Sequence, residues 1–232
     1  MKATVLIPAH DEEHYLGRCL EKLDASLTEP IVLANDCSDG TVAVAKKFGA
    51  AVFETEQPGK LPAIQNALRL LNTYGEPFII IDADTYPLLP RTWVRQMTNQ
   101  MNPRVPEIRT GPIYYNPDTR NVFHALLRTV GAEKYARSEG SHLVAEANMA
   151  LNLDQSTLDE IIVMDHYWPG EGYMMRQKVW EHNGTYSRAG LQAGVVTSMR
   201  RLGTLKDRHN WLQGYRDRAP EGSIVPEDLV HL

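Results

Sequence analysis

The chain has 232 residues, of which 43% are hydrophobic and 23% are charged, and both fractions are ordinary for a globular protein. Its formal net charge of −5 offers no basic surface for the phosphates of a nucleic acid, so we expect no nucleic-acid partner. With two cysteines and no apolar stretch near the ~18 residues that span a membrane, the sequence predicts a cytoplasmic protein without a transmembrane segment, free or peripheral to a membrane.

The first part of the chain alternates short β-branched runs with amphipathic segments. Strands are expected at 4–8, 30–36, 50–55 and 77–82, separated by helices at about 12–25, 39–48 and 61–75. This order is typical of an α/β fold with a parallel sheet and crossover helices. Because the strands are apolar along their whole length, both faces of the sheet are expected to be covered.

The second part of the chain, after about residue 105, follows this order less regularly. Strands are expected at 107–115, 142–152 and 193–199, and helices at 119–138, 172–184 and 200–215. This part is also richer in aromatic and basic residues. It suits a more variable region fused to the sheet.

Polar residues follow three of the four strands expected in the first part. "PAHDEE" (8–13) follows the first strand, "NDCSDGT" (35–41) the second and "DAD" (82–84) the fourth. Ligands of open parallel sheets bind beyond the carboxyl ends of the strands. The three segments therefore predict one shared pocket.

Two carboxylates, Asp82 and Asp84, end the fourth strand. A buried carboxylate is costly unless water, a basic partner or a cation compensates it. Mg²⁺ and Mn²⁺ prefer oxygen ligands and commonly use one or two carboxylates together with phosphate oxygens. The pair predicts a divalent metal, Mg or Mn, that carries a diphosphate. The alternative is that both aspartates cap a turn or the following helix.

Asp36 and Lys60 lie beside this predicted pocket. Ser38 or Asp39 can serve as the N-cap of the helix at 39–48, which leaves Asp36 available to accept a hydrogen bond from a base or a ribose. Lys60 either belongs to the solvated surface or lies along the rim of the pocket beside a phosphate.

These segments, in this order, resemble the family 2 glycosyltransferases of the GT-A fold. The stretches that carry the resemblance are "TVLIPAHDEEHYLGRCLEKL" (4–23), "ANDCSDGT" (34–41), "GKLPAIQNAL" (59–68) and "IIIDADTYP" (79–87). It extends more thinly to "EANMALN" (146–152), "GEGYMMRQKV" (170–179) and "VVTSMRR" (195–201). The resemblance implies a mostly parallel nucleotide-binding sheet flanked by helices, with a fused mixed acceptor-side region.

The resemblance also implies one GT-A-like domain over 1–232, with a nucleotide-sugar-binding half (1–104), an acceptor and catalytic-base half (105–217) and a tail (218–232). The donor would be a nucleotide-diphospho-sugar of UDP or GDP type. The residues expected to bind its nucleotide are Pro8, Ala9, His10, Glu12, Asp36, Lys60 and Asp82. Asp36 would contact the base, Asp82 would lie near the ribose or the metal, and Asp84 would bind the metal directly.

An inverting transfer needs a base that takes the proton of the acceptor hydroxyl. In the resembled family this base is an acidic residue of an "ED"-like motif before a helix, and "PGEGYMM" offers Glu171 with Gly172 where the second acid is often found. Glu171 is the first candidate and Asp165 the second. A solvated glutamate near a helix N-terminus is the alternative for Glu171.

Further residues are candidates for the donor sugar or the diphosphate. Asn148 and Met149 are expected to line the sugar pocket, or Asn148 satisfies backbone groups. Arg200 and Arg201 are expected to contact the diphosphate or an anionic acceptor, or they lie on a helix surface. His209 is a weaker candidate for the metal, and three tryptophans either stack on a sugar or belong to the core, namely Trp168, Trp180 and Trp211.

The sequence thus predicts a metal-dependent, inverting glycosyltransferase with an unidentified hydroxyl acceptor on a glycan, lipid or small molecule. A non-catalytic nucleotide-sugar-binding protein stays open because Gly172 departs from the motif. A sugar nucleotidyltransferase needs a glycine-rich, basic loop after the first strand, where "PAHDEE" is acidic and has no glycine. An NAD-dependent oxidoreductase is disfavoured because GxGxxG is absent there.

Overall fold

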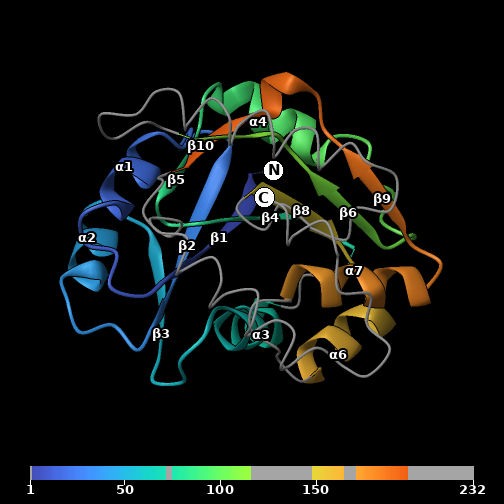
Figure 1. The fold of residues 1–232 in the computed structure, drawn as a ribbon, viewed down its shortest axis with the longest axis horizontal. Helices are drawn as coiled ribbons and strands as arrows, with labels where there is room; N and C mark the ends of the chain where they lie inside the picture. The colour runs from blue at the N-terminus through green and yellow to red at the C-terminus, as the bar shows by residue number, and fades with distance from the viewer. Residues whose placement is uncertain (1, 72–74, 116–147, 165–170, 198–232) are drawn as a thin grey trace, which may run out of the picture.

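The computed structural model describes residues 2–71, 75–115, 148–164 and 171–197, and the structural statements below refer to these residues. The centre of the fold is a seven-stranded sheet with the strand order β3-β2-β1-β4-β8-β6-β9 (Figure 1). Its strands are β1 (Ala3–Ala9), β2 (Thr28–Asn35), β3 (Ala51–Thr55), β4 (Phe78–Ile81), β6 (Glu107–Thr110), β8 (Asn148–Asn152) and β9 (Thr185–Arg188).

Six of these seven strands run in the same direction. β1, β2, β3 and β4 are mutually parallel, and β6 is parallel to β9. β8 is antiparallel to both of its neighbours, β4 and β6. The mostly parallel sheet expected from the sequence is therefore confirmed, and strands from both halves of the chain share it.

Helices cover both faces of the sheet. The helices are α1 (Leu16–Glu21), α2 (Thr41–Lys47), α3 (Lys60–Leu71), α4 (Pro90–Thr98), α6 (Gln155–Val163) and α7 (Glu171–Glu181). α1, α2 and α4 pack in one hydrophobic cluster, and α3, α6 and α7 pack in the other (Figure 1). Within the described ranges, no helix combines the length and apolar character needed to cross a bilayer.

The continuous apolar strands divide their side chains between these two clusters. In β4, Ile79 and Ile81 belong to the cluster of α1, α2 and α4, whereas Phe78 and Ile80 belong to the cluster of α3, α6 and α7. All four side chains are almost completely buried. Successive residues of a strand point to opposite faces, so a strand covered on both faces has no polar positions.

A second, three-stranded sheet has the order β5-β10-β7. It consists of β5 (Thr85–Pro87), β7 (Ile113–Tyr115) and β10 (Val195–Thr197), and β10 is antiparallel to β5 and parallel to β7. A short 3₁₀ helix, η1 (Leu191–Ala193), precedes β10. Because only three residues, Asp82 to Asp84, separate β4 from β5, this small sheet adjoins the "DAD" turn.

The single strand expected at 107–115 is wrong, because the structure divides it into β6 and β7. The division falls at Gly111, where an added Cβ would lie only 2.3 Å from Asn148 Nδ2 and 2.7 Å from the Ala193 carbonyl oxygen. A residue with a side chain would clash with these atoms. The chain can therefore leave the large sheet here and enter the small one.

The helix expected at 12–25 is shorter than predicted and spans only Leu16–Glu21. After its end, Asp24 forms a turn. Its side chain accepts a hydrogen bond from Ser26 N, and its carbonyl oxygen accepts one from Leu27 N, at 2.9 Å each.

The helix expected at 172–184 begins at Glu171 and ends at Glu181, and Asn183 takes the left-handed conformation that follows it. The helices expected at 119–138 and 200–215 lie outside the described residues.

Candidate active site

The first residues after β1, β2 and β4 are His10, Asp36 and Asp82. β1 is parallel to both neighbours, with Ala9 opposite Ala34 of β2 and Leu6 opposite Ile80 of β4. The three strand ends therefore meet at one edge of the sheet. His10 and Asp36 are exposed there, and Asp82 is half-buried.

Asp82 forms an ion pair with Lys60 at this edge. The Lys60 Nζ atom lies 2.6 Å from Asp82 Oδ1, and the two side chains are only 18% and 21% exposed. Lys60 is the first residue of α3, so the start of this helix places the Lys60 ammonium group at the end of β4. Of the two alternatives for Lys60, the solvated surface is wrong, because this side chain is largely buried against a carboxylate.

Asp84 is held by hydroxyl groups of the small sheet. Thr85 Oγ1 and Thr197 Oγ1 donate to Asp84 Oδ1 over long distances of 3.3 and 3.4 Å. The two threonines are paired across β5 and β10, and Thr85 Oγ1 lies 2.8 Å from Thr197 Oγ1. The turn itself is closed by Thr85 N, which donates to the Asp82 carbonyl oxygen at 3.0 Å.

Cys19 of α1 lies beneath this turn. Its Sγ atom is 3.9 Å from the Asp82 carbonyl oxygen, and the side chain is buried. Burial, together with the negative charges of Asp84 and Asp82, raises the pKa of the Cys19 thiol. A thiol that stays protonated is unreactive, so Cys19 contributes packing to the site.

Asp11, Glu13 and Asp39 form a second group of carboxylates, which we call the β1–β2 clasp. Asp11 Oδ1 accepts a hydrogen bond from Ser38 N at 2.7 Å, and Glu13 Oε2 accepts one from Gly40 N at 2.8 Å. In the opposite direction, Asp39 Oδ2 accepts one from Glu13 N at 3.0 Å. Each loop thus satisfies backbone N–H groups of the other.

The clasp changes the ionisation of its carboxylates. The hydrogen bond from Ser38 N is the largest cause that lowers the pKa of Asp11. Burial acts to raise the pKa of Asp39, but hydrogen bonds from Thr41 and from Glu13 N outweigh it and lower the pKa.

The expected N-cap of α2 needs correction. The N-cap residue of α2 is Gly40, whereas Ser38 and Asp39 precede it. Asp39 nevertheless accepts a hydrogen bond from Thr41 N at 2.9 Å, so its carboxylate caps the helix from one residue further away than expected.

Asp11, Cys37 and Asp39 also place ligand atoms within 4.8 Å of one another. Because both carboxylates already accept backbone hydrogen bonds, we assign no metal to them.

The residues expected at the nucleoside differ in accessibility. Pro8 and Ala9 are buried in β1, and Glu12 is only 1% exposed, with its backbone N–H donating to Thr41 Oγ1 at 2.7 Å. His10 is exposed, and its Nδ1 atom lies 2.8 Å from the Asn35 carbonyl oxygen. His10 and Asp36 are therefore the two side chains of this group that offer a surface to a ligand, whereas the Glu12 side chain is buried.

Asn148 of β8 is fully buried. Its Oδ1 atom accepts a hydrogen bond from Trp93 Nε1 at 2.8 Å, and its Nδ2 atom donates to the carbonyl oxygens of Pro112 and Ala193 at 3.1 and 2.9 Å. The side chain amide thus uses its oxygen and both N–H groups inside the protein. These contacts agree with the alternative that Asn148 satisfies backbone groups, and Met149 beside it is also buried.

The remaining candidates are Glu171, Asp165, the two arginines, His209 and the tryptophans. Glu171 is the first residue of α7, and only its backbone is described. Asp165, Trp168, Arg200, Arg201, His209 and Trp211 lie outside the described residues. Trp180 is 73% exposed on α7 and is not a core residue, whereas Trp93, which the sequence did not single out, is completely buried.

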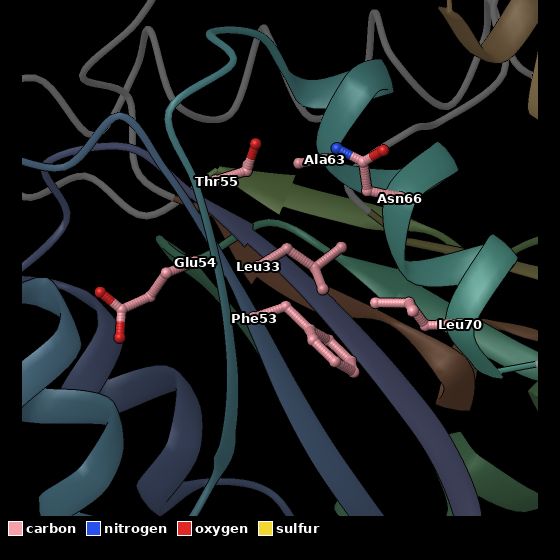
Figure 2. A pocket seen from close by; sticks show the side chains of 7 residues that line it. All are labelled: Leu33, Phe53, Glu54, Thr55, Ala63, Asn66 and Leu70. Carbon is pink, nitrogen blue, oxygen red and sulfur yellow. The ribbon is translucent and has the colours of Figure 1, made fainter.

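A cavity of about 280 Å³ lies between β2, β3 and α3 (Figure 2). Leu33 and Phe53 point from the strands toward α3, and Leu70 faces them from the helix (Figure 2). None of the residues expected to bind the donor lines this cavity. It lies beside the edge strand β3 and is not the predicted pocket at the ends of β1, β2 and β4.

The helix-covered, mostly parallel sheet with polar strand ends and a small mixed sheet beside β4 defines a protein of the GT-A type. Solved structures of this type are similar to the chain. A mannosyltransferase from Pyrobaculum calidifontis, in complex with GDP-Man and Mn²⁺, has a TM-score of 0.64 at 18% identity, over 99% of this chain and 68% of that one.

Two further structures show the same fold. Glucosyl-3-phosphoglycerate synthase from Mycobacterium tuberculosis, in complex with Mn²⁺, UDP and phosphoglyceric acid, has a TM-score of 0.57 at 19% identity, over 94% of this chain and 78% of that one. TarS 1–349 from S. aureus, in complex with UDP-GlcNAc, has a TM-score of 0.60 at 15% identity, over 93% of this chain and 65% of that one. No curated protein matches the sequence.

The particular family follows from the sequence itself. Residues 4–144, more than half of the chain, match the model of glycosyl transferase family 2. The chain therefore belongs to this family of glycosyltransferases. The match contains all three strand ends described above, and with them both the clasp and the "DAD" turn.

Proposed function

We propose that the chain is a metal-dependent, inverting glycosyltransferase that moves a sugar from a nucleotide-diphospho-sugar to an acceptor hydroxyl. The observation that carries this proposal is the Asp82–Asp84 turn, which places two half-buried carboxylates and the Lys60 ammonium at the carboxyl edge of a parallel sheet. Family membership supports the transfer of a sugar. The solved structures that contain GDP-Man or UDP with Mn²⁺ support a donor of UDP or GDP type.

The donor set at this turn fits a divalent cation. Asp82 and Asp84 supply hard carboxylate oxygens, the kind that Mg²⁺ and Mn²⁺ prefer, and neither side chain is fully buried. We propose that Asp84 binds the metal directly and that Asp82 lies beside it, near the ribose. When bound, the cation supplies positive charge that stabilises the negative charge of the departing diphosphate.

The chain's own residues would orient the donor around this turn. Asp36 would accept a hydrogen bond from the base, and His10 would lie against the nucleoside, since both are exposed at the adjoining strand ends. Lys60 holds Asp82 in place through the 2.6 Å ion pair and brings a positive charge close to the expected diphosphate. Arg200 and Arg201 are proposed as further phosphate contacts.

The acceptor hydroxyl needs a base on the side opposite the leaving group. We propose Glu171, at the first residue of α7, as the residue that takes this proton. The acceptor oxygen then forms a bond with the anomeric carbon while the bond between that carbon and the phosphate oxygen breaks. Asp165 is the second candidate. Gly172 stands where the family motif often has another acid, so this motif itself offers only Glu171.

The same observations bear on the alternatives. A sugar nucleotidyltransferase would need a glycine-rich, basic loop after β1 to hold phosphates, whereas "PAHDEE" is acidic and has no glycine. In this chain, the N–H groups of Ser38, Asp39, Gly40 and Thr41 donate to the carboxylates of the clasp. A non-catalytic nucleotide-sugar-binding protein would bind the donor but leave it intact.

The experiment that tests the proposal follows release of nucleoside diphosphate from UDP- and GDP-sugars with and without Mn²⁺. The wild-type chain is expected to hydrolyse or transfer one of these donors only with the metal. Asp84→Ala should lose turnover and metal-dependent donor binding, whereas Glu171→Gln should lose turnover and keep donor binding. Donor binding without turnover in the wild-type chain would instead support the non-catalytic alternative.

A further inference from the structure

The β1–β2 clasp lies beside Asp36, the residue that is proposed to contact the base. Asp36 lies between β2 and the loop segment from Ser38 to Thr41. On one side, Asp36 N donates to the Thr55 carbonyl oxygen of β3 at 2.8 Å. On the other side, Ser38 N donates to Asp11 Oδ1 at 2.7 Å. The position of Asp36 therefore depends on hydrogen bonds that begin in the loop after β1.

The backbone of Asp36 needs such support. Its φ angle is 50°, which lies in the left-handed region, and Asp11 has a φ angle of 51°. Residues other than glycine adopt this region rarely, and the surrounding structure must hold them there. The hydrogen bonds of Ser38 and Thr55 lie directly beside Asp36 and provide this restraint.

A second connection ties the same two loops together. Glu13 Oε2 accepts from Gly40 N at 2.8 Å, while Asp39 Oδ2 accepts from Glu13 N at 3.0 Å. Thr41 Oγ1, which is buried, accepts from Glu12 N at 2.7 Å. The contacts run in both directions, so neither loop can shift without breaking hydrogen bonds of the other.

The clasp also directs where an anion can bind. Its three carboxylates occupy the backbone donors that precede and begin α2, and they add negative charge there. A diphosphate would be repelled from this position. The Lys60 ammonium at the end of β4 is the contrasting positive group. The clasp therefore makes the nucleoside side of the pocket negative and restrains its loops. We expect the diphosphate to bind on the other side, at the end of β4, where Lys60 lies.

We infer that Asp11 and Glu13 are positioning residues for the donor: they hold the loop of Asp36 in its binding conformation and thereby set donor affinity, without taking part in the chemical step. This inference rests on the proposed function, because it requires the donor nucleoside to lie at the ends of β1 and β2. It assigns a role to the acidic part of "PAHDEE" that is separate from metal binding.

The test compares two changes at one position. Asp11→Ala removes the acceptor of the Ser38 and Asp39 N–H groups, and Asp11→Asn keeps one side-chain oxygen that can still accept from Ser38 N. Isothermal titration gives the Kd of UDP and of GDP with Mn²⁺, and kinetics give the donor KM and kcat. Asp11→Ala should raise the Kd and KM about tenfold with kcat at saturating donor nearly unchanged, and Asp11→Asn should recover most of the affinity.

A matched control separates positioning from loss of stability. Asp154 is the N-cap of α6 and accepts from Thr157 N at 2.8 Å, so Asp154→Ala also removes a carboxylate that caps backbone N–H groups, but on a different helix. It should lower the melting temperature and leave the Kd unchanged. If Asp11→Ala does not fold, Glu13→Ala with Glu13→Gln makes the same comparison at Gly40.

The outcomes distinguish this inference from the proposed function. If the wild-type chain binds neither UDP nor GDP with Mn²⁺, the proposed function is wrong and this inference falls with it. If the wild-type chain binds one of them and Asp11→Ala binds it equally well, or if Asp11→Ala lowers kcat as strongly as it raises KM, the positioning role alone is wrong.

Discussion

Acidic residues follow both β1 and β4, but the structure uses them in opposite ways. After β1, Asp11 and Glu13 accept hydrogen bonds from backbone N–H groups of the neighbouring loop, at 2.7 and 2.8 Å. After β4, Asp82 pairs with the Lys60 ammonium, and Asp84 has two threonine hydroxyls at 3.3 and 3.4 Å. The first group holds the backbone, and the second is placed beside a cation and hydroxyl groups.

This difference shows that the number of carboxylates near a pocket does not identify the ligand site. Backbone N–H donors make the clasp carboxylates part of the scaffold, and a ligand would have to displace those hydrogen bonds. The two aspartates of the "DAD" turn are half-buried at the sheet edge, and Asp82 lies next to the Lys60 ammonium. Substitutions can therefore distinguish a residue that binds a ligand from a residue that supports the fold.

The largest effect is expected at the end of β4. Asp84→Ala removes the proposed metal ligand, so turnover of the donor should fall by about a thousandfold, since the charge of the departing diphosphate is no longer stabilised. Steady-state release of UDP or GDP measures the loss. The melting temperature without ligand should change little, because Asp84 is half-buried. Glu29→Ala, which removes an exposed carboxylate at the start of β2, is the control.

The second-largest effect is expected for Asn148, whose side chain makes three hydrogen bonds to other groups inside the protein. Asn148→Ala leaves Trp93 Nε1 and the carbonyl oxygens of Pro112 and Ala193 without this partner, so the free energy of unfolding should fall by about 3 kcal/mol. Urea denaturation measures the change. Asn66→Ala, at a half-buried position of α3, should cost far less. Unchanged stability together with weaker donor binding would instead support the expectation that Asn148 lines the sugar pocket.

A smaller effect is expected at Lys60. Lys60→Met leaves the half-buried Asp82 carboxylate without the cation at 2.6 Å, so the Kd of UDP or GDP with Mn²⁺ should rise about tenfold, and Lys60→Arg should stay close to wild type. Titration calorimetry gives both values. Lys46→Met breaks an exposed pair with Glu54 and should leave the Kd unchanged. Equal effects of the Lys46 and Lys60 changes on the Kd would contradict the proposal that Lys60 acts at the donor site.

The smallest effect concerns a carboxylate that serves the fold alone. Hydrogen bonds from Ser26, followed by the one from Arg91, lower the pKa of Asp24 from 3.8 to about 2. A pKa lowered by folding means that Asp24 stabilises the protein above pH 3.8 and that this contribution is lost as the pH falls from 3.8 toward 2. Asp24→Asn should therefore be less stable than wild type at pH 7, and the difference should shrink at pH 3. A difference that is constant with pH would contradict the assignment.

Much of the first half of the fold could be predicted because its strands are continuous apolar runs covered on both faces. Ile79 and Ile81 bury on one side and Phe78 and Ile80 on the other, which leaves a pattern that is easy to recognise. Shorter elements escaped prediction. β5 and β9 have only three and four residues and pair with the distant strands β10 and β6, and α6 begins at its cap residue Asp154. α4 was missed although its buried residues Trp93, Val94 and Met97 lie at helical spacing.

The candidate site could be located from the sequence, but the roles of its residues could not all be assigned. The positions of His10, Asp36 and Asp82 follow from the rule that parallel strands end at one edge. The Lys60–Asp82 pair, the clasp and the contacts of Asn148 join residues far apart in the chain. No local pattern encodes such pairings, because they depend on how the elements pack.

The central claim is that the turn after β4 holds a divalent metal. Titration of Mn²⁺ in the presence of UDP or GDP, followed by the electron paramagnetic resonance signal of free Mn²⁺, tests it directly. The wild-type chain should remove about one Mn²⁺ per chain from solution, Asp11→Asn should do the same, and Asp84→Ala should leave the signal of free Mn²⁺ intact. Equal binding of Mn²⁺ by Asp84→Ala and the wild-type chain, or no binding by the wild-type chain, would contradict the claim.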